Sequence, residues 1–214
     1  MKVLFLICSI LGLALAGPTA AQQTIDGKGA LAEFDRGMAA LETDSFSVAR
    51  TAFDHACQYD VGAACFNLGL LNLKGRGAPA DKQQAATLFR KGCLGRDGKY
   101  ASADACYNYG IMLEQGMLGD PDLAAARTFY GKGCDLDQPS ACLNAGNMAL
   151  TGQGGEVDDP DAFARYQRAC DLEQATACYN AAYMIGKKRA TAPEDRPFAY
   201  FKERACELGA EKAC

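Results

Sequence analysis

The sequence is poor in the residues and motifs that most catalytic and cofactor sites require. It contains one histidine, His55, so a catalytic triad or a histidine-rich metal centre has at most one imidazole to use. The C-x-x-C spacing, which zinc sites and thioredoxin-type redox centres use, is absent, as are G-x-S-x-G and P-loop motifs. We therefore predict no metal and no cofactor, and an enzymatic role is disfavoured.

An excess of basic charge is also lacking. The chain has 22 Lys+Arg against 26 Asp+Glu, a formal net charge of −4. Nucleic-acid-binding proteins usually carry a basic surface that displaces counterions from phosphates. The composition therefore predicts no nucleic-acid partner.

Long apolar runs are absent after residue 21. Before it, Lys2 precedes an almost wholly apolar stretch from Val3 to Ala16, and small residues follow. This pattern is typical of a secretory signal peptide at residues 1–21, with cleavage after Ala16 or Ala21. A membrane anchor needs roughly 18 apolar residues, more than this stretch has. We expect a periplasmic or secreted protein that is not inserted in a membrane once the leader is removed.

Cysteine, in contrast, is abundant. Of eleven cysteines, Cys8 lies in the leader, and the even number that remains suggests disulfides in an oxidising compartment. The first members of the five pairs recur after 36, 41, 36 and 36 residues, a period that indicates a solenoid of supersecondary units. The pairs are Cys57/Cys65, Cys93/Cys106, Cys134/Cys142, Cys170/Cys178 and Cys206/Cys214.

Four of these pairs are spaced by eight residues, and that spacing constrains the backbone. Residues eight apart on one continuous helix are separated by roughly 12 Å. A disulfide requires Cα atoms within about 4.4–6.8 Å, so the chain must turn between the two cysteines. Each bridge then joins the end of one repeat to the start of the next. Zinc binding is the competing interpretation, but zinc favours closer thiolates, often with histidines.

Other residues recur in register with the cysteines. Alanine precedes every second cysteine, an asparagine follows four of them by two places, and a small residue follows by four. An aromatic residue lies four places before the first cysteine in four units, whereas the last unit has Lys202 there and Phe201 one place earlier. Such spacings place residues on one helical face, so we predict an all-α protein. The expected helices are 29–42, 45–57, 62–74, 81–93, 102–115, 121–134, 139–151, 160–171, 174–186 and 195–206, with a stub from 209.

Glycine-rich breaks separate many of these helices. Asp120-Pro121 and Asp159-Pro160 follow two of the breaks. We expect the aspartate to be the N-cap and the proline to lie in the first helical turn.

The run Ala141-Cys142-Leu143-Asn144-Ala145-Gly146, followed by Gly152-Gln153-Gly154, resembles a Sel1-like repeat. With the eight-residue cysteine spacing, the resemblance narrows to the Helicobacter cysteine-rich protein family. It covers about residues 45–214, while Ala30 to Cys57 is more similar to a tetratricopeptide pair. The resemblance implies an α/α solenoid, a right-handed superhelix of hairpins with disulfide-linked neighbours. We therefore expect a leader at 1–21, a helix pair at 22–58, and about four Sel1-like repeats at 59–214 with the last helix truncated.

The same resemblance implies two different functions. Some members of the family are described as penicillin-binding proteins or weak β-lactamases, whereas the repeat is mainly known as a protein-interaction scaffold. Serine β-lactamases use S-x-x-K, and no lysine follows any serine of the mature chain by three places. A weak β-lactam hydrolase therefore remains an alternative that rests on resemblance alone.

The asparagine ladder provides the best candidate for binding. Asn67, Asn108, Asn144 and Asn180 occupy the same place in successive repeats, on the first helix of each pair. In tetratricopeptide-like superhelices that helix lines the concave surface. Amide side chains both donate and accept, so a row of them can pair with the backbone of an extended peptide. Alternatively, each asparagine bonds a neighbouring loop and fixes the repeat. The leading hypothesis is an exported scaffold that binds an unidentified protein or peptide on its concave face.

Overall fold

The computed structural model describes residues 27–95, 98 and 100–214, so the predicted signal peptide lies outside the described residues. The described part contains ten α-helices, one short 3₁₀ helix and no strand. This confirms the all-α prediction. The helices are α1 (Gly27–Glu42), α2 (Phe46–Gln58), α3 (Gly62–Lys74), α4 (Lys82–Leu94), α5 (Ala103–Glu114), α6 (Leu123–Asp135), α7 (Pro139–Thr151), α8 (Asp159–Asp171), α9 (Ala175–Gly186), α10 (Phe198–Glu207) and η1 (Glu211–Ala213).

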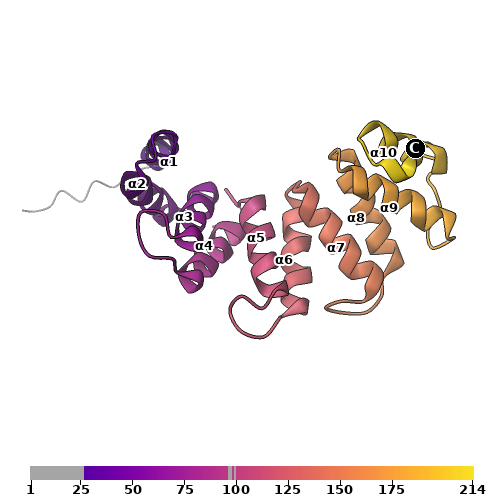
Figure 1. Cartoon of the computed structure of the whole chain (residues 1–214), viewed down its shortest axis with the longest axis horizontal. Helices are drawn as coiled ribbons and strands as arrows, with labels where there is room; N and C mark the ends of the chain where they lie inside the picture. Colours follow the sequence, from indigo (N-terminus) through magenta and orange to yellow (C-terminus); the bar gives the residue numbers. More distant parts are fainter. Residues whose placement is uncertain (1–26, 96–97, 99) are drawn as a thin grey trace, which may run out of the picture.

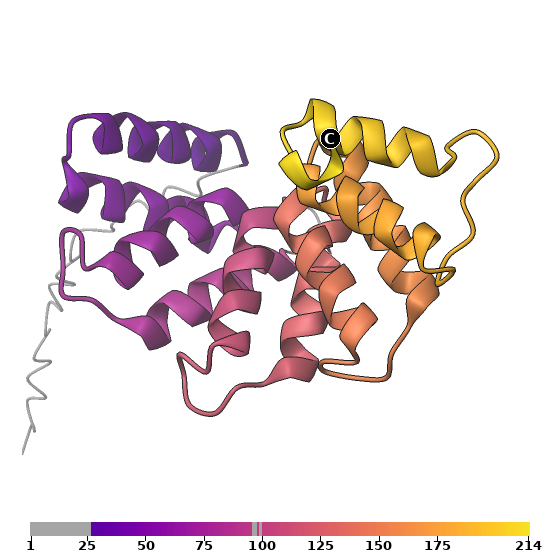
Figure 2. The same ribbon diagram turned by 45° about the vertical axis from the view of Figure 1, so that its right-hand side comes forward.

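The helices form five antiparallel pairs, each packed on the next, and the ribbon traces an open arc (Figures 1 and 2). Each helix contacts mainly its neighbours in the sequence, which is the organisation of a solenoid. The N-terminal pair and the C-terminal pair lie at opposite ends of this arc, as Figure 2 shows.

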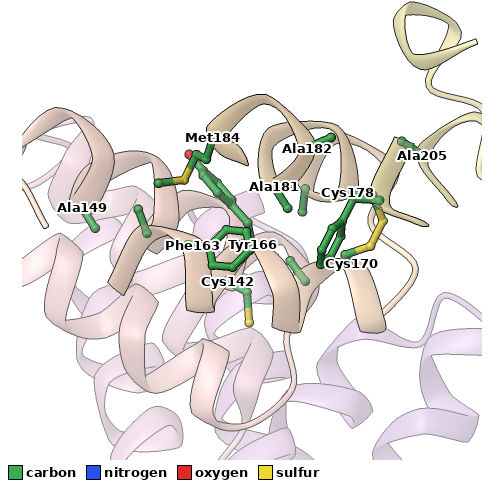
Figure 3. Packing of buried hydrophobic residues seen from close by; sticks show 14 of the residues in the cluster. Cys142, Ala149, Phe163, Tyr166, Cys170, Cys178, Ala181, Ala182, Met184 and Ala205 are labelled. Atoms are coloured by element: carbon green, nitrogen blue, oxygen red, sulfur yellow. A yellow bond between two sulfur atoms is a disulfide. The ribbon is translucent and has the colours of Figure 1, made fainter. Parts of the chain in front are cut away.

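One aromatic ring fills the centre of each of the first four pairs. In the fourth pair, Tyr166 of α8 is fully buried beneath Gly146 of α7. A Cβ atom at Gly146 would lie 2.7 Å from the ring, so this close approach requires glycine. Figure 3 shows Tyr166 within the surrounding cluster. The equivalent glycine–ring pairs are Gly37–Phe53, Gly69–Phe89 and Gly110–Tyr130.

Each of the first four disulfides joins the end of a second helix to the start of the helix that follows, so one bridge lies at each junction between successive pairs, as the sequence predicts. The fifth, Cys206–Cys214, joins α10 to the residue that follows η1. Figure 3 shows the Cys170–Cys178 bridge beside the alanines of α9. The Cα–Cα distances are 4.7 Å for Cys57–Cys65, 4.5 Å for Cys93–Cys106, 4.4 Å for Cys134–Cys142, 4.6 Å for Cys170–Cys178 and 5.0 Å for Cys206–Cys214.

The longer spacing of the second cysteine pair leaves its bridge unchanged. Cys93 and Cys106 are 13 residues apart instead of 8, yet their Cα atoms are as close as those of the other pairs. Cys106 is the fourth residue of α5, just as Cys65 is the fourth residue of α3. The five extra residues therefore lengthen only the connection between the helices, and the junction keeps its geometry.

The turn inside three of the eight-residue cysteine loops has a recurrent ion pair. Asp60, Asp137 and Glu173 each adopt a left-handed conformation with φ near 64°. Each carboxylate faces a basic side chain 31 residues further along, in the next pair. The distances are 3.7 Å for Asp60–Lys91, 2.8 Å for Asp137–Arg168 and 3.0 Å for Glu173–Arg204. Exposed pairs contribute about 0.2–1 kcal/mol each, so they orient neighbouring repeats more than they stabilise them.

Two predicted helix starts are wrong in detail. The N-caps are Asp122 and Asp158, because their Oδ1 atoms accept from the backbone N–H three residues on, at 2.9 Å in both helices. Asp120 and Pro121 precede α6, and Asp159 is already helical. The last helix also begins later than predicted, at Phe198, since Pro197 occupies its N-cap.

Candidate protein-binding surface

The first two predicted cysteine pairs form buried disulfides. Cys65 and Cys106 are both 0% exposed, so these bridges have a structural role. The Sγ atom of each lies 3.6 Å from the backbone carbonyl oxygen of its bridge partner, Cys57 or Cys93, and is enclosed by its own loop. A partner or a reagent therefore cannot reach these sulfurs in the folded protein.

Of the other three bridges, only the one at the C-terminal end is accessible. The bridges Cys134–Cys142 and Cys170–Cys178 are buried like the first two. In the last bridge, Cys214 is exposed and Cys206 is half-buried.

Equivalent side chains of the first helices form a surface that we call the first-helix row. It comprises the residues two and five places after each second cysteine, on α3, α5, α7 and α9. On α1 the equivalent places, aligned through the ring-facing glycine, hold Asp35 and Met38. The other members are Asn67, Leu70, Asn108, Ile111, Asn144, Asn147, Asn180 and Tyr183.

The row combines half-buried and exposed groups. The four asparagines predicted from the sequence are half-buried, whereas Asn147 is exposed. Tyr183 and Met38 are 47% and 41% exposed. A partner could therefore reach both amide and apolar groups along this row.

In the N-terminal half, the ladder asparagines bond to their own helices. Asn67 Nδ2 donates to the carbonyl of Ala63 at 2.9 Å, and Asn108 Nδ2 donates to that of Asp104 at 2.8 Å. For both asparagines, the central ring of the preceding helix pair is a phenylalanine, which has no hydroxyl to which the amide could bond. Each amide therefore turns to the nearest backbone acceptor, four residues earlier.

In the C-terminal half, the rings are tyrosines and their hydroxyls link three helices. The Tyr130 hydroxyl donates to Glu114 Oε2 of α5 at 2.6 Å, and Asn144 of α7 is also hydrogen-bonded to it. Burial raises the pKa of Tyr130 well above 10, and the neighbouring Glu114 carboxylate raises it further. The phenol therefore remains a neutral donor throughout the physiological range.

Tyr166 makes the same kind of link one repeat later. Its hydroxyl donates to Asn147 Oδ1 of α7 at 2.8 Å, and Asn180 Nδ2 of α9 lies 3.4 Å from the same oxygen. Burial raises the pKa of Tyr166 to about 12, although the hydrogen bond from Asn180 and the charge of Arg189 act in the opposite direction.

The ladder therefore lies on one surface, and each of its four amides has an intramolecular hydrogen bond. These bonds go to the asparagine's own helix or to side chains of neighbouring helices, and not to a neighbouring loop as the alternative supposed; the role in binding stays a prediction. The tyrosine hydroxyls were not predicted from the sequence as partners of the amides. The signal was available: the ring changes from Phe53 and Phe89 to Tyr130 and Tyr166, and a buried hydroxyl needs a partner.

A groove of about 340 Å³ opens at the C-terminal end of the row, between α9, α10 and η1. It lies where the repeat pattern places the central ring, because Lys202 replaces the aromatic residue there. Phe201 does not compensate: it is fully buried against Phe163 of α8, with ring centroids 6.0 Å apart. The lining residues are Tyr179, Ala182, Tyr183, Gly186, Lys187, Phe198, Lys202, Lys212 and Ala213.

The second helices carry a different surface, dominated by ion pairs. Arg165 contacts Asp135 at 2.8 Å and Asp161 at 3.1 Å, and Arg127 lies 3.8 Å from Asp161. These residues line a depression of about 520 Å³. Because its charges are already paired internally, this surface has less to offer a charged partner.

The groups considered for catalysis have structural contacts. His55 Nδ1 lies 3.8 Å from a carboxylate oxygen of Glu33, and the hydroxyl of Ser102 accepts from Ala105 N–H at the start of α5. In the described ranges, no three His, Cys, Asp or Glu side chains are grouped so that they could hold a metal ion. Within the same ranges, no helix has the length and apolar character needed to cross a membrane.

The recurring geometry agrees with a family model for the Sel1 repeat, which matches residues 62–97, 103–138 and 139–173, half of the chain. The chain belongs to the Sel1 repeat family. The resemblance stated from the sequence is thereby confirmed. A search of curated proteins finds no match.

Two solved structures support this fold, and a third is similar in sequence. A Sel1 repeat protein from Oxalobacter formigenes superposes with a TM-score of 0.72 at 19% identity, over 83% of this chain and 71% of that chain. A protective antigen of uropathogenic Escherichia coli with an SLR fold gives 0.50 at 17% identity, over 87% of this chain and 47% of its own. Helicobacter pylori cysteine-rich protein B is 27% identical, over 61% of this chain and 96% of that one, with a TM-score of 0.47. The five disulfides of this chain indicate an oxidising compartment.

Proposed function

We propose that this Sel1 repeat protein is an exported, non-enzymatic scaffold, periplasmic or secreted, that binds a segment of a partner protein along the first-helix row on its concave face. The observation that supports this most is the row itself. It carries asparagine amides in equivalent places on four successive first helices, with the exposed apolar side chains of Met38 and Tyr183 at its two ends, a surface that a solenoid core does not require.

The row suits an extended segment. Neighbouring helices in packed proteins lie about 8–10 Å apart. An extended chain rises about 3.3 Å per residue, so every third residue of such a segment would face the next helix. Each asparagine amide has two N–H groups and one oxygen, and the internal bonds leave capacity to pair with a peptide backbone. The backbone supplies affinity in this mode, and side chains such as Tyr183 and Met38 select the sequence.

Internal hydrogen bonds prepare the row for binding. Tyr166, Asn147 and Asn180 hold one another in place across three helices. A partner then binds side chains that have already lost their freedom, which lowers the entropic cost of association. The disulfides support the same effect, because they fix each helix pair relative to the next.

Site-specific photo-crosslinking tests this proposal. A photoreactive phenylalanine analogue is placed at Ile111 or Asn147 in the row, or at Thr87 or Thr128 on the second helices as exposed controls. Each variant is produced with its own leader in an exporting bacterium and irradiated in the intact cell. We expect a discrete adduct from the row positions and none from the control positions. Equal adducts from both sets, or none from the row, would contradict the proposal.

A further inference from the structure

The fifth helix pair lacks the ring that fills the other four. In the place of the ring, Lys202 is exposed, and the residue opposite is Ala182 instead of glycine. Phe201 packs with its ring centroid 6.0 Å from that of Phe163, and both Ala182 and Lys202 line the groove. The groove between α9 and α10 is therefore a vacant aromatic position of the repeat.

The walls of this groove are largely apolar. Tyr183 and Phe198 are 47% and 44% exposed and face it from α9 and α10. The small residues Ala182 and Gly186 leave room between them, and Ala213 of η1 lies at the edge. A volume of about 340 Å³ accommodates an aromatic side chain with part of its backbone and lies near the lower end of the range for ligand pockets, about 300–1,000 Å³.

Three exposed lysines surround the apolar walls: Lys187 directly after α9, Lys202 on α10 and Lys212 on η1. In the part of the chain that the structure describes, none of them forms an ion pair. Lys187 Nζ instead lies 5.6 Å from the centroid of the Tyr183 ring. On the same helix as Lys202, Arg204 does have acidic partners, Glu173 and Glu207. The groove therefore offers unpaired positive charge around an apolar centre.

We propose that this groove binds a partner segment that carries an aromatic side chain flanked by carboxylates. The ring enters the place that Tyr166 fills one repeat earlier, and the carboxylates meet the three lysines. This inference rests on the proposed function and deepens it, because Tyr183 belongs to both the groove and the row. A segment that runs along the row would end with its aromatic residue in the groove.

Peptide binding to the oxidised mature protein tests the inference. The probe is a blocked, fluorescein-labelled heptapeptide with one phenylalanine between pairs of glutamates, measured by fluorescence anisotropy at low salt. We expect saturable binding that weakens as salt increases, since exposed charges are screened. Replacing the phenylalanine by alanine, or the glutamates by lysines, should weaken binding at least ten-fold. Equal binding of all three peptides would overturn the inference.

Restoring the repeat pattern gives a sharper test. Lys202→Tyr, combined with Ala182→Gly to admit the ring, should refill the groove and weaken probe binding at least ten-fold without loss of helical content. Lys187→Glu with Lys202→Glu should have the same effect, because both side chains are exposed and their exchange leaves the core intact. The matched control, Lys82→Glu with Arg90→Glu, changes the net charge equally on α4 and should leave binding unchanged. Undiminished binding to the refilled groove, or an equal loss in the control, refutes the inference.

The two proposals fail separately. Crosslinks confined to the row, together with no probe binding, leave the scaffold function standing and reject the groove. Probe binding that the groove variants abolish, without crosslinks from the row, supports the groove and rejects the row.

Discussion

Two glycine-to-alanine changes should have different effects on stability, because only one glycine faces a ring. At Gly146 an added Cβ would lie 2.7 Å from Tyr166 Cε1 and 3.3 Å from the carbonyl oxygen of Ala162. At Gly131, on the neighbouring helix α6, an added Cβ would have only Arg165 Nη2 near it, at 3.7 Å. The helical preference of alanine over glycine is the same at both places.

The expected magnitudes follow from these contacts. Alanine in place of glycine stabilises a helix interior by about 1 kcal/mol, so Gly131→Ala should raise the free energy of unfolding by about that amount. Overpacking a buried site costs about 1–3 kcal/mol, which cancels or outweighs the same gain for Gly146→Ala. The two variants should therefore differ by about 1–3 kcal/mol. At about 2–4 °C per kcal/mol for a chain of this size, their Tm values should be several degrees apart.

Thermal unfolding followed by circular dichroism, with the disulfides intact, measures this difference. Ala182→Gly provides a further control, because no ring enters the fifth pair and glycine there should simply lower stability by about 1 kcal/mol. A Gly146→Ala variant that is as stable as Gly131→Ala would refute the view that the ring determines the residue opposite it.

Three further predictions concern the tyrosines and the cysteines. Because the pKa of Tyr166 is raised to about 12 in the folded state, its contribution to stability is fully present below pH 10 and is lost as the pH rises towards 12. Between these pH values the free energy of unfolding should decrease by on the order of 2 kcal/mol because of Tyr166, and Tyr166→Phe should remove this decrease in chemical denaturation. An unchanged slope of the free energy against pH in the variant would count against this role of Tyr166. Limited reduction should open the exposed Cys206–Cys214 bridge first and the buried bridges of Cys65 and Cys106 later, seen by mass spectrometry after alkylation, whereas simultaneous opening of all bridges would contradict the burial pattern. Complete reduction of the mature protein should add ten alkyl groups and alkylation without reduction none, and any thiol labelled in the native protein would show incomplete pairing.

The charged and capping residues show where sequence reasoning was less successful. A basic residue lies two places before each first cysteine, but the sequence does not show its partner, such as Asp137 for Arg168, which lies in the preceding repeat. The helix starts were misplaced for a related reason. Several aspartates near each start are chemically able to cap, and only the backbone path shows that Asp122 reaches the free N–H groups.

The amino-acid sequence by itself determined the helices, the repeat and the positions of the disulfides. These follow from local rules: residues three or four apart share a helical face, and cysteines eight apart can meet only across a turn. Tertiary structure alone decided what the asparagines contact and what the irregular last repeat means. Asn180 meets Asn147 and Tyr166 only when neighbouring pairs pack, because these residues belong to three separate helices. The sequence shows that Lys202 stands where the other repeats have an aromatic residue. Only the tertiary structure shows that Phe201 packs against Phe163 and that a groove opens beside Lys202.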